Sequence, residues 1–360
     1  MKKVYLALLC TSITLMASAK IWRVNNNTGI VADFTNIQAA NDAAAVHNGD
    51  TIHVEASASG YGGIYLNKRL VILGAGYYLT ETSPMVANPQ TEANPNISYF
   101  SFMYLNPGSK GSVISGIYIN SYCIIQDSLV TVQHCYMNGD FYFGDNGTTL
   151  SAYADTIRQN LITGAFRAGS SSVGKYKNML VYNNIIGGSS MDFSSNINRV
   201  DGYFINNDFV FYYSAGSQGN AVNITTANFV YQNNIWGYVN FGAYQTSNVY
   251  FNNICNGTGV PAGNSNQQNI NASTAVYKDW TGNGAGFSSD GRFALKTGAN
   301  PASNTGTING VSVDCGAFGG PAPYILSGMP NMPSIYTLTV PTQINAGTAS
   351  MNVTISSASH

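Results

Sequence analysis

The chain has 360 residues, of which only 9% are charged, and its formal net charge is −1. Ordinary soluble domains carry about 25% charged residues, and disordered chains combine low hydrophobicity with high net charge. With 44% hydrophobic residues, 38 glycines and no cluster of Lys and Arg, the sequence excludes a charge-driven disordered protein and a nucleic-acid-binding protein.

The first 19 residues are typical of a secretory signal. Lys2 and Lys3 precede a short apolar stretch, which ends in an Ala-Ser-Ala motif at residues 17–19. The apolar stretch is too short to span a membrane, and no later segment approaches about 18 consecutive apolar residues. We therefore expect cleavage near Ala19, no transmembrane segment, and a protein that is secreted or held on the outer cell surface.

A sequence motif of two apolar residues, two Asn and a further apolar residue recurs in the middle of the chain. Its copies are residues 113–117, 132–137, 157–162, 181–185, 204–209, 230–235 and 250–254. Aligned on the second Asn, six of them mark positions 135, 160, 184, 207, 234 and 253. The number of residues between these positions fits a repeat of three short strands and the bends that join them. The segments expected to form strands are rich in Val, Ile, Tyr and Phe. No 3.6-residue periodicity persists here, so a helical solenoid is excluded.

The paired Asn residues have a structural explanation. Asn tolerates a positive φ better than most residues, which suits a sharp bend between strands. Its side-chain amide can also bond to the equivalent Asn of the neighbouring repeats, in a ladder that satisfies buried polar groups. We interpret these residues as structural, and not as ligands.

This repeat resembles the right-handed parallel β-helix of the pectin-lyase-like superfamily. Segments similar to the capping helix, the first strand and the closing part of that fold are residues 35–46, 49–54, 291–296, 300–302 and 314–319. The resemblance implies an all-β fold with a short N-terminal capping helix and a single-stranded right-handed parallel β-helix over residues 20–320. The superfamily contains lyases, hydrolases, adhesins and inert scaffolds, so the resemblance implies no single activity.

Residues 321–360 follow as a Pro-rich join and a β-hairpin. Two strands are expected over residues 334–340 and 350–355, around an Asn-Ala-Gly turn. The hairpin would either cap the open end of the coil, where unpaired strand edges invite aggregation, or begin an attachment segment.

In this superfamily, substrates usually lie along one strand face. Alternation of inward and outward side chains predicts an outward row with one residue per strand, about 4.8 Å apart. The row is Tyr142, Arg167, Asp192, Asn223 and Asn240, with Asp140 and Asp145 on either side of Tyr142. Arg167 and Asp192 are the candidate catalytic residues. Tyr142 would be a stacking platform, and binding would also use Asn223, Asn240 and Asp140. The alternative is a surface ion pair worth about 0–1 kcal/mol.

Known catalytic patterns of the superfamily are absent. The polygalacturonase-like motifs Asn-Thr-Asp, Asp-Asp, Gly-His-Gly and Arg-Ile-Lys do not occur. General acid–base hydrolysis requires two carboxylates within about 5–10 Å, and the row contains one Asp. Calcium requires about six to eight oxygen ligands, and no strip of clustered Asp is visible. We therefore expect no cofactor, and calcium is an alternative that no carboxylate cluster supports.

The 24 Tyr, together with Asn and Ser, predict a neutral exterior that can stack and hydrogen-bond. We expect a monomer that binds a polysaccharide or a cell-surface glycan without cleaving it, and adhesion fits such a surface equally well. The alternative is a polysaccharide lyase or glycoside hydrolase that acts at the outward row. Ice binding fits poorly, because no regular Thr-x-Thr column is present.

Five further residues have a structural interpretation. Cys123, Cys135, Cys255 and Cys315 are widely separated. Exported chains can form disulfides, but this spacing favours small buried apolar residues. His134 takes the place of an Asn in its repeat, and a bend residue with a backbone partner is favoured over a metal ligand, because no second Cys/His pair stands at zinc spacing.

Overall fold

The structure is a computed structural model of the chain. The residues that it describes are 19–79, 96–144, 151–169, 175–188, 191–193, 200–210, 222–223, 228–237, 247–280, 289–330, 334–341, 343–344, 346–347 and 349–358. The expected signal segment, apart from Ala19, lies outside these residues.

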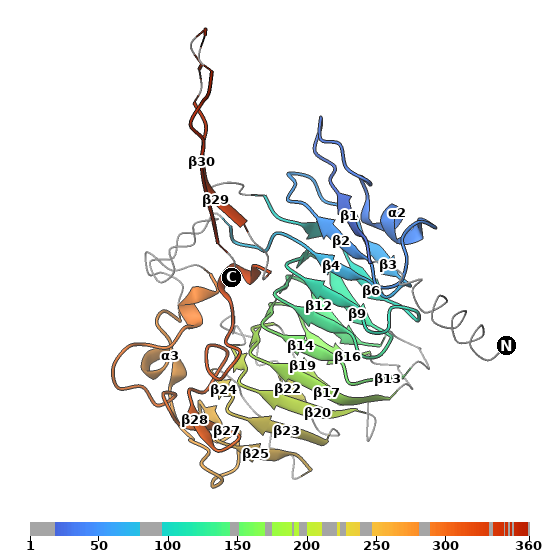
Figure 1. The fold of residues 1–360 in the computed structure, drawn as a ribbon. Coiled ribbons are helices and arrows are strands. Elements are labelled where there is room, and N and C mark those ends of the chain that lie inside the picture. Colours follow the sequence, from blue (N-terminus) through green and yellow to red (C-terminus); the bar gives the residue numbers. More distant parts are fainter. Residues whose placement is uncertain are drawn as a thin grey trace, which may run out of the picture.

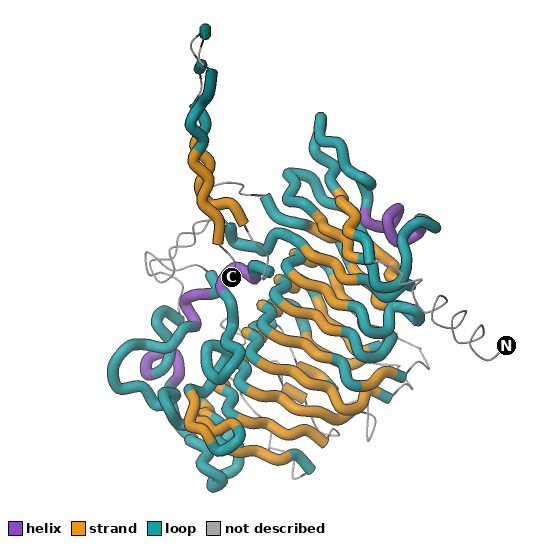
Figure 2. Tube along the Cα trace, viewed as in Figure 1, coloured by secondary structure: helices purple, strands orange, loops and turns teal. Residues whose placement is uncertain are grey.

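Most regular structure in the described residues is β-strand, which confirms the all-β class, and three parallel sheets dominate it (Figures 1 and 2). The first sheet contains β1 (Ile21–Val24), β2 (Thr51–Val54), β4 (Val71–Leu73), β7 (Val113–Ser115), β10 (Thr131–Gln133), β14 (Thr156–Arg158), β17 (Tyr176–Tyr182), β20 (Val200–Ile205), β23 (Asn228–Gln232) and β25 (Val249–Phe251), with β13 (Ala152–Tyr153) also paired to β17. The second sheet contains β5 (Tyr99–Phe100), β8 (Tyr118–Ile119), β11 (Tyr136–Met137), β15 (Leu161–Ile162), β18 (Ile185–Ile186), β21 (Asp208–Phe209), β24 (Ile235–Trp236) and β26 (Ile254–Cys255). The third sheet contains β3 (Ile64–Leu66), β6 (Met103–Leu105), β9 (Tyr122–Ile125), β12 (Asp140–Phe143), β16 (Phe166–Ala168), β19 (Met191–Asp192) and β22 (Val222–Asn223).

From β5 to β24 the chain visits the second, third and first sheets in turn, and we call one such passage a circuit. Each strand pairs in parallel with its counterparts in the neighbouring circuits, as Thr131 does with Val113 and Thr156. Because the pairing is in register, equivalent residues of successive circuits form rows with a spacing of about 4.8 Å.

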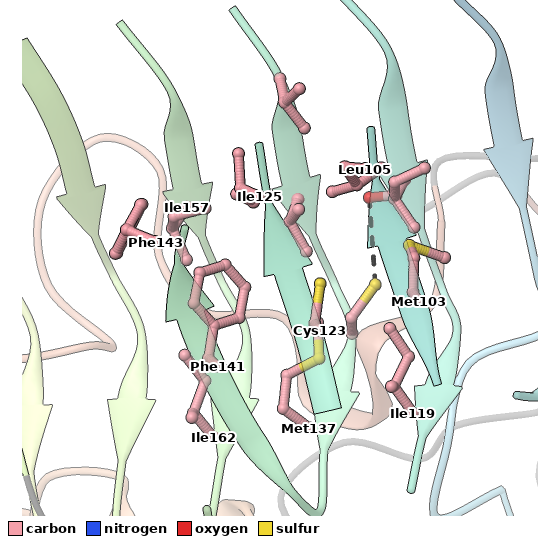
Figure 3. Close-up of a cluster of buried hydrophobic side chains, with 14 of the residues drawn as sticks. Met103, Leu105, Ile119, Cys123, Ile125, Met137, Phe141, Phe143, Ile157 and Ile162 are labelled. Carbon is pink, nitrogen blue, oxygen red and sulfur yellow. Dashed lines mark hydrogen bonds between the residues drawn. The ribbon is translucent and has the colours of Figure 1, made fainter. Parts of the chain in front are cut away.

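Side chains that point between the three sheets form one apolar core. Figure 3 shows its middle part, where Met103, Cys123 and Phe141 from the third sheet face Met137 from the second. The rows of this core continue from circuit to circuit, and the rings of Phe141 and Phe166 stack with their centroids 5.3 Å apart.

A short helix lies at the N-terminal end of the sheets. Helix α2 (Ile37–Asp42) begins where the side chain of Asn36 accepts a hydrogen bond from Ala39 N at 3.1 Å, which is a favourable N-cap. The helix is shorter than the expected segment, residues 35–46, because Ala43 already adopts an extended conformation.

The first residue of each Asn pair makes the bend between the first and second sheets. At six such positions φ lies between 52° and 57°, in the left-handed region that Asn tolerates. These positions are His134, Gln159, Asn183, Asn206, Asn233 and Asn252.

The second residue of each pair forms the predicted ladder. It runs through Asn160, Asn184, Asn207, Asn234, Asn253 and Asn266. Oδ1 of Asn207, for example, accepts from both N and Nδ2 of Asn184 at 3.0 Å, while its own Nδ2 donates to Val181 O at 2.9 Å. These partners allow the amides to be buried without an unsatisfied donor. Asn266 continues the ladder although it belongs to no repeat.

Residues 302–330, which we call the strap, return along the Asn bends in the direction opposite to the circuits. Asn206 Nδ2 donates to Asp314 O at 2.8 Å, and Asn183 Nδ2 donates to Ala317 O at 2.8 Å. Gln159 Nε2 donates to Pro323 O at 2.6 Å. Further along, Tyr324 and Tyr77 join through their hydroxyl groups, so the strap extends from the late circuits to the N-terminal part of the molecule.

The strap and the segment before it cover the outer face of the second sheet. This cover contains α3 (Ala272–Ala275), η1 (Gly291–Phe293), η2 (Leu326–Gly328) and an antiparallel hairpin of β27 (Gly306–Ile308) and β28 (Val311–Val313). Apolar residues of the sheet such as Ile185 and Ile235 pack against Tyr277 and Ala317. Asp208 lies in the same outward row, between Ile185 and Ile235, and is therefore fully buried under the strap.

A second antiparallel hairpin follows, formed by β29 (Ser334–Thr339) and β30 (Thr354–Ala358). Figure 1 shows these strands extending away from the three sheets. The parallel strands themselves lie between Ile21 and Cys255. The domain boundaries at residues 20–320 and 321–360, and the role of the hairpin as cap or attachment segment, stay predictions.

Candidate functional site

The predicted outward row lies on the outer face of the third sheet. Parallel pairing places Arg167 between Tyr142 and Asp192, and places Asp192 beside Asn223. Predicted site residues outside the described part of the chain are Asn240, Asp145 and the side chain of Asn223. The row is therefore described in full for Tyr142, Arg167 and Asp192.

Strict alternation along the strands makes these three side chains point outward. Phe141 and Phe143 on either side of Tyr142 are fully buried, and Phe166 next to Arg167 is buried as well. A slip of one residue would turn these Phe rings toward solvent, so burial of the rings fixes the outward direction of Tyr142 and Arg167.

Three polar side chains form a closed triangle, which we call the polar cluster. Arg167 Nη2 donates to Asp140 Oδ2 at 2.7 Å and to Tyr142 Oη at 2.6 Å. The Tyr142 hydroxyl donates in turn to Asp140 Oδ2 at 2.8 Å, and the guanidinium lies 4.9 Å from the centre of the Tyr142 ring. The second oxygen of Asp140 accepts from Ala165 N at 2.8 Å, which ties the carboxylate to the next strand.

The hydroxyl of Tyr142 acts as a donor in this cluster. Partial burial and then its hydrogen bond to Asp140 raise the pKa of Tyr142 above its ordinary value, although Arg167 opposes the shift. Tyr142 therefore stays protonated at neutral pH and is a hydrogen-bonding group, not a base.

Two carboxylates, Asp140 and Asp192, lie on the described part of this face. Asp140 and Asp192 stand two strands apart and two residues apart along the strand direction, which places their Cα atoms about 12 Å from each other. Asp140 already binds Arg167 and Tyr142. The Cα separation alone does not exclude the about 5–10 Å between carboxyl groups that general acid–base hydrolysis needs, so the engagement of Asp140 is the feature that disfavours this chemistry.

Four aromatic side chains continue the same face toward the N-terminus, and we call them the aromatic platform: Tyr65, Phe102, Tyr104 and Tyr122. Tyr65 and Tyr104 stack with centroids 5.0 Å apart, and Phe102 and Tyr122 stack at 5.4 Å. The two pairs meet edge to face, with Tyr104 5.4 Å from Tyr122. Tyr65 is 48% exposed and the other three rings are half-buried, so the platform is an aromatic surface open to solvent.

The aromatic platform and the polar cluster belong to one surface. Register places Tyr65 beside Tyr104, Tyr104 beside Ile124, and Ile124 beside Tyr142. Ile124 is only 4% exposed, so the two halves meet over a buried side chain. In the adjacent row, Tyr122 lies beside Asp140. The aromatic half was not predicted, because its strands precede the clear Asn pairs that set the frame of the repeat. Alternation in Ile64–Leu66 and Met103–Leu105, each with a central Tyr between apolar residues, is the signal that could have revealed it.

No metal site was predicted, and the described residues contain no group of three His, Cys, Asp or Glu side chains that could hold a metal ion. Cys123, Cys135, Cys255 and Cys315 are buried and form no disulfide with one another, as their spacing predicts. Burial raises the pKa of Cys135 and of Cys315 to about 12, so these thiols stay protonated.

His134 occupies the bend position of its repeat, with Cys135 at the ladder position. Its Nε2 lies 2.9 Å from Gln159 Oε1, and its Nδ1 lies 3.4 Å from Ser115 Oγ. Gln159 Nε2 donates to the strap, so its Oε1 faces the ring, and the proton of His134 is assigned to Nε2. The ring is thus held by side chains, and not by the backbone partner that we expected.

Comparisons of the chain with models of protein families, with curated proteins and with solved structures find no match. Among the described residues, no helix has the length and apolar character needed to cross a membrane.

Proposed function

We propose that the chain forms a single right-handed parallel β-helix of the pectin-lyase-like kind. Support comes from the regular passage through three parallel sheets and from the Asn ladder at one bend. The right-handed sense is supported because connections between parallel strands of one sheet are right-handed in about 98% of cases.

We propose that this protein binds a glycan on the outer face of the third sheet and does not cleave it. The observation that carries the proposal is the continuous row in which the aromatic platform adjoins the polar cluster. Sugars present both C–H faces, which pack on aromatic rings, and hydroxyl groups, which pair with carboxylate, guanidinium and phenol groups. This surface offers both kinds of partner within neighbouring strands.

A polysaccharide lyase or glycoside hydrolase is the second candidate function. It is favoured by one observation, the placement of Arg167 and Asp192 on adjacent strands of the same row. The engagement of Asp140 by Arg167 and Tyr142 favours binding without catalysis.

The proposal includes an extracellular setting. The N-terminal residues have the pattern of a secretory signal, and we propose a secreted or surface-held monomer that meets polysaccharide or cell-surface glycan. No cofactor is needed for binding of this kind.

The test is a panel of soluble and insoluble polysaccharides, read by calorimetric titration and pull-down, with reducing-sugar and unsaturated-product assays in parallel. Wild-type protein is expected to bind at least one glycan without releasing product. Arg167→Ala is expected to weaken this binding by about tenfold or more, because it removes a charged donor from the proposed contact surface and the group that orients Asp140 and Tyr142.

Arg158 supplies the matched control. On the outer face of the first sheet its Nε donates to Gln133 Oε1 at 2.7 Å and its Nη1 donates to Tyr182 Oη at 2.9 Å, so its surroundings resemble those of Arg167. Arg158→Ala is expected to bind as wild type does. Absence of binding to every glycan, or equal losses in the two variants, would contradict the proposal, and product release abolished by Asp192→Asn would favour the enzyme.

A further inference from the structure

The row that joins the aromatic platform to the polar cluster is long. It runs from Tyr65 on β3 to Arg167 on β16, and four strand intervals separate these residues. At about 4.8 Å per interval the row spans about 19 Å. A single sugar ring is much smaller than this span, so only a chain of sugars can contact both ends.

The two ends of the row can make different kinds of contact with a ligand. Tyr65 and Tyr104 present stacked rings and their hydroxyl groups, without any charge. At the other end, Arg167 presents hydrogen-bonding groups that are already organised by Asp140. A ligand that spans the row therefore places apolar sugar faces at one end and a hydroxyl-rich unit at the other.

The charge of this face excludes a strongly anionic ligand. In the strands of the third sheet, as far as the structure describes them, the charged residues are Asp140, Arg167 and Asp192, a formal net charge of −1. The guanidinium of Arg167 is paired with Asp140 at 2.7 Å, and Asp192 occupies the next position of the row. A polyanion would meet two carboxylates here and one cation that is already neutralised.

We infer that the ligand of this surface is an extended, uncharged oligosaccharide of about four or five sugar units that lies along the row, across the strands. This inference rests on the proposed function and specifies its substrate class. Tyr65 contacts the end of the chain farthest from Arg167, so it contributes to affinity only when the chain is long enough to reach it.

The experiment uses the full chain and two oligosaccharide series, each running from disaccharides to chains of about eight units. One series consists of neutral β-1,4-linked glucans, mannans and xylans, and the other of oligogalacturonates. Dissociation constants are measured by calorimetry for wild type, Tyr65→Ala and Tyr203→Ala. Tyr203 lies on the first sheet and is 48% exposed, as Tyr65 is, so its variant is the matched control.

We expect affinity for one neutral series to rise about tenfold or more from the disaccharide to about five units, and then to level off. Tyr65→Ala should remove most of this gain, so that its affinity for about five units falls close to its affinity for the disaccharide, while Tyr203→Ala follows wild type. Raising the salt concentration from about 0.05 to 0.5 M should change these constants less than twofold, because the ligand is uncharged.

The outcomes separate this inference from the proposed function. Binding that depends on Arg167 but is independent of chain length, or is unchanged in Tyr65→Ala, overturns the inference and leaves the proposed function standing. Tighter binding of oligogalacturonates than of every neutral series overturns it as well. Failure to bind any glycan refutes the proposed function, and the inference with it.

Discussion

Gly316 of the strap passes directly over the carboxyl group of Asp208. A Cβ at this glycine would lie 2.4 Å from Asp208 Oδ1, and the φ of Gly316 is +86°. Neither oxygen of Asp208 has a hydrogen-bond partner within normal distance, and the residue is fully buried. Against the larger effect of burial, Ala317 N and the Tyr277 hydroxyl act to lower the pKa of Asp208, and Asp208 in turn acts on the pKa of the buried thiol of Cys315.

Substitution of Gly316 should loosen the strap. In Gly316→Ala the new methyl group meets Asp208 and the backbone is strained at positive φ, so we expect a loss of about 2–5 kcal/mol in the free energy of unfolding. Gly310→Ala is the control, because Gly310 has a φ of +79° but nothing within 4 Å of its Cβ position. It should lose only about 1–2 kcal/mol. Equal losses in urea denaturation of the two variants would show that the contact with Asp208 is unimportant.

Asp208 should make the protein less stable as the pH rises. Burial raises its pKa well above the ordinary value, against the smaller effects of Ala317 N and Tyr277. A carboxyl group with a raised pKa in the folded state favours folding only while protonated. Stability is therefore lost above the ordinary carboxyl range, by about 1.4 kcal/mol per pH unit until the folded-state pKa is passed.

Asp208→Asn tests this dependence, since the amide has nearly the same shape and never ionises. The variant should gain stability relative to wild type as the pH rises from 5 to 8, when both are unfolded in urea. A constant difference between wild type and Asp208→Asn across this range would contradict the assignment. Burial also raises the pKa of Asp155 to about 8. Part of the decrease in stability with pH should therefore remain in Asp208→Asn.

His134 should have the opposite effect in acid. Burial lowers its pKa to about 4, with a small opposing effect of Gln159 and a further decrease from Arg158. Because the folded-state pKa lies below the unfolded value, stability falls as the pH drops from about 6.5 to about 4, by about 3 kcal/mol in total.

His134→Asn should remove this contribution and keep the bend, since Asn occupies the equivalent position in the later repeats. Denaturation at pH 7 and pH 4 should show a smaller acid loss in the variant than in wild type. If His134→Asn loses as much stability in acid as wild type does, the ring does not titrate as described.

The ladder should contribute more to stability than the bends. Asn207→Ala leaves Asn184 N without its acceptor and removes one of the three acceptors of Asn184 Nδ2. It also removes the amide that donates to Val181 O and Asn234 Oδ1, so we expect a loss of about 3 kcal/mol. Asn206→Gly keeps the positive φ and loses the bonds to Asp314 O and Gly316 O of the strap, together with the bond that Asn206 Oδ1 accepts from Asn233 Nδ2. Asn233 Nδ2 keeps a partner in Thr307 O, so the loss should amount to about 1–2 kcal/mol. A larger loss of stability in Asn206→Gly than in Asn207→Ala, measured by chemical denaturation, would contradict the different roles assigned to the two Asn positions.

The parallel repeats and the position of the candidate site could be predicted from local sequence patterns. The spacing of the Asn pairs aligned Asn160, Asn184 and Asn207, and the structure joins these residues in one ladder. Alternation then placed Arg167 beside Asp192 correctly. Both predictions depend on rules that act within a strand or between neighbouring repeats, and these rules are visible in sequence.

The remaining features depend on contacts between distant segments. The aromatic platform lies in strands without an Asn pair, so no frame aligned Tyr65 with Tyr104. The strap binds through its main-chain carbonyls, such as Ala317 O, and backbone groups leave no trace in the residue pattern. The burial of Asp208 follows from the strap and the segment before it, because the outward row of an uncovered sheet would leave that side chain in water.

The strap also changes how the molecule can come apart. In an array of repeats each unit contacts only its neighbours, so such arrays fray from their ends and lose structure unit by unit. Here one segment is hydrogen-bonded to Asn206, Asn183 and Gln159 in separate circuits and reaches Tyr77 beyond them. Unfolding of any one circuit therefore disturbs the strap, which is also bound to the other circuits. Under mechanical load or heat, the protein should unfold in one cooperative transition, whereas an array without a strap would unfold in several smaller steps.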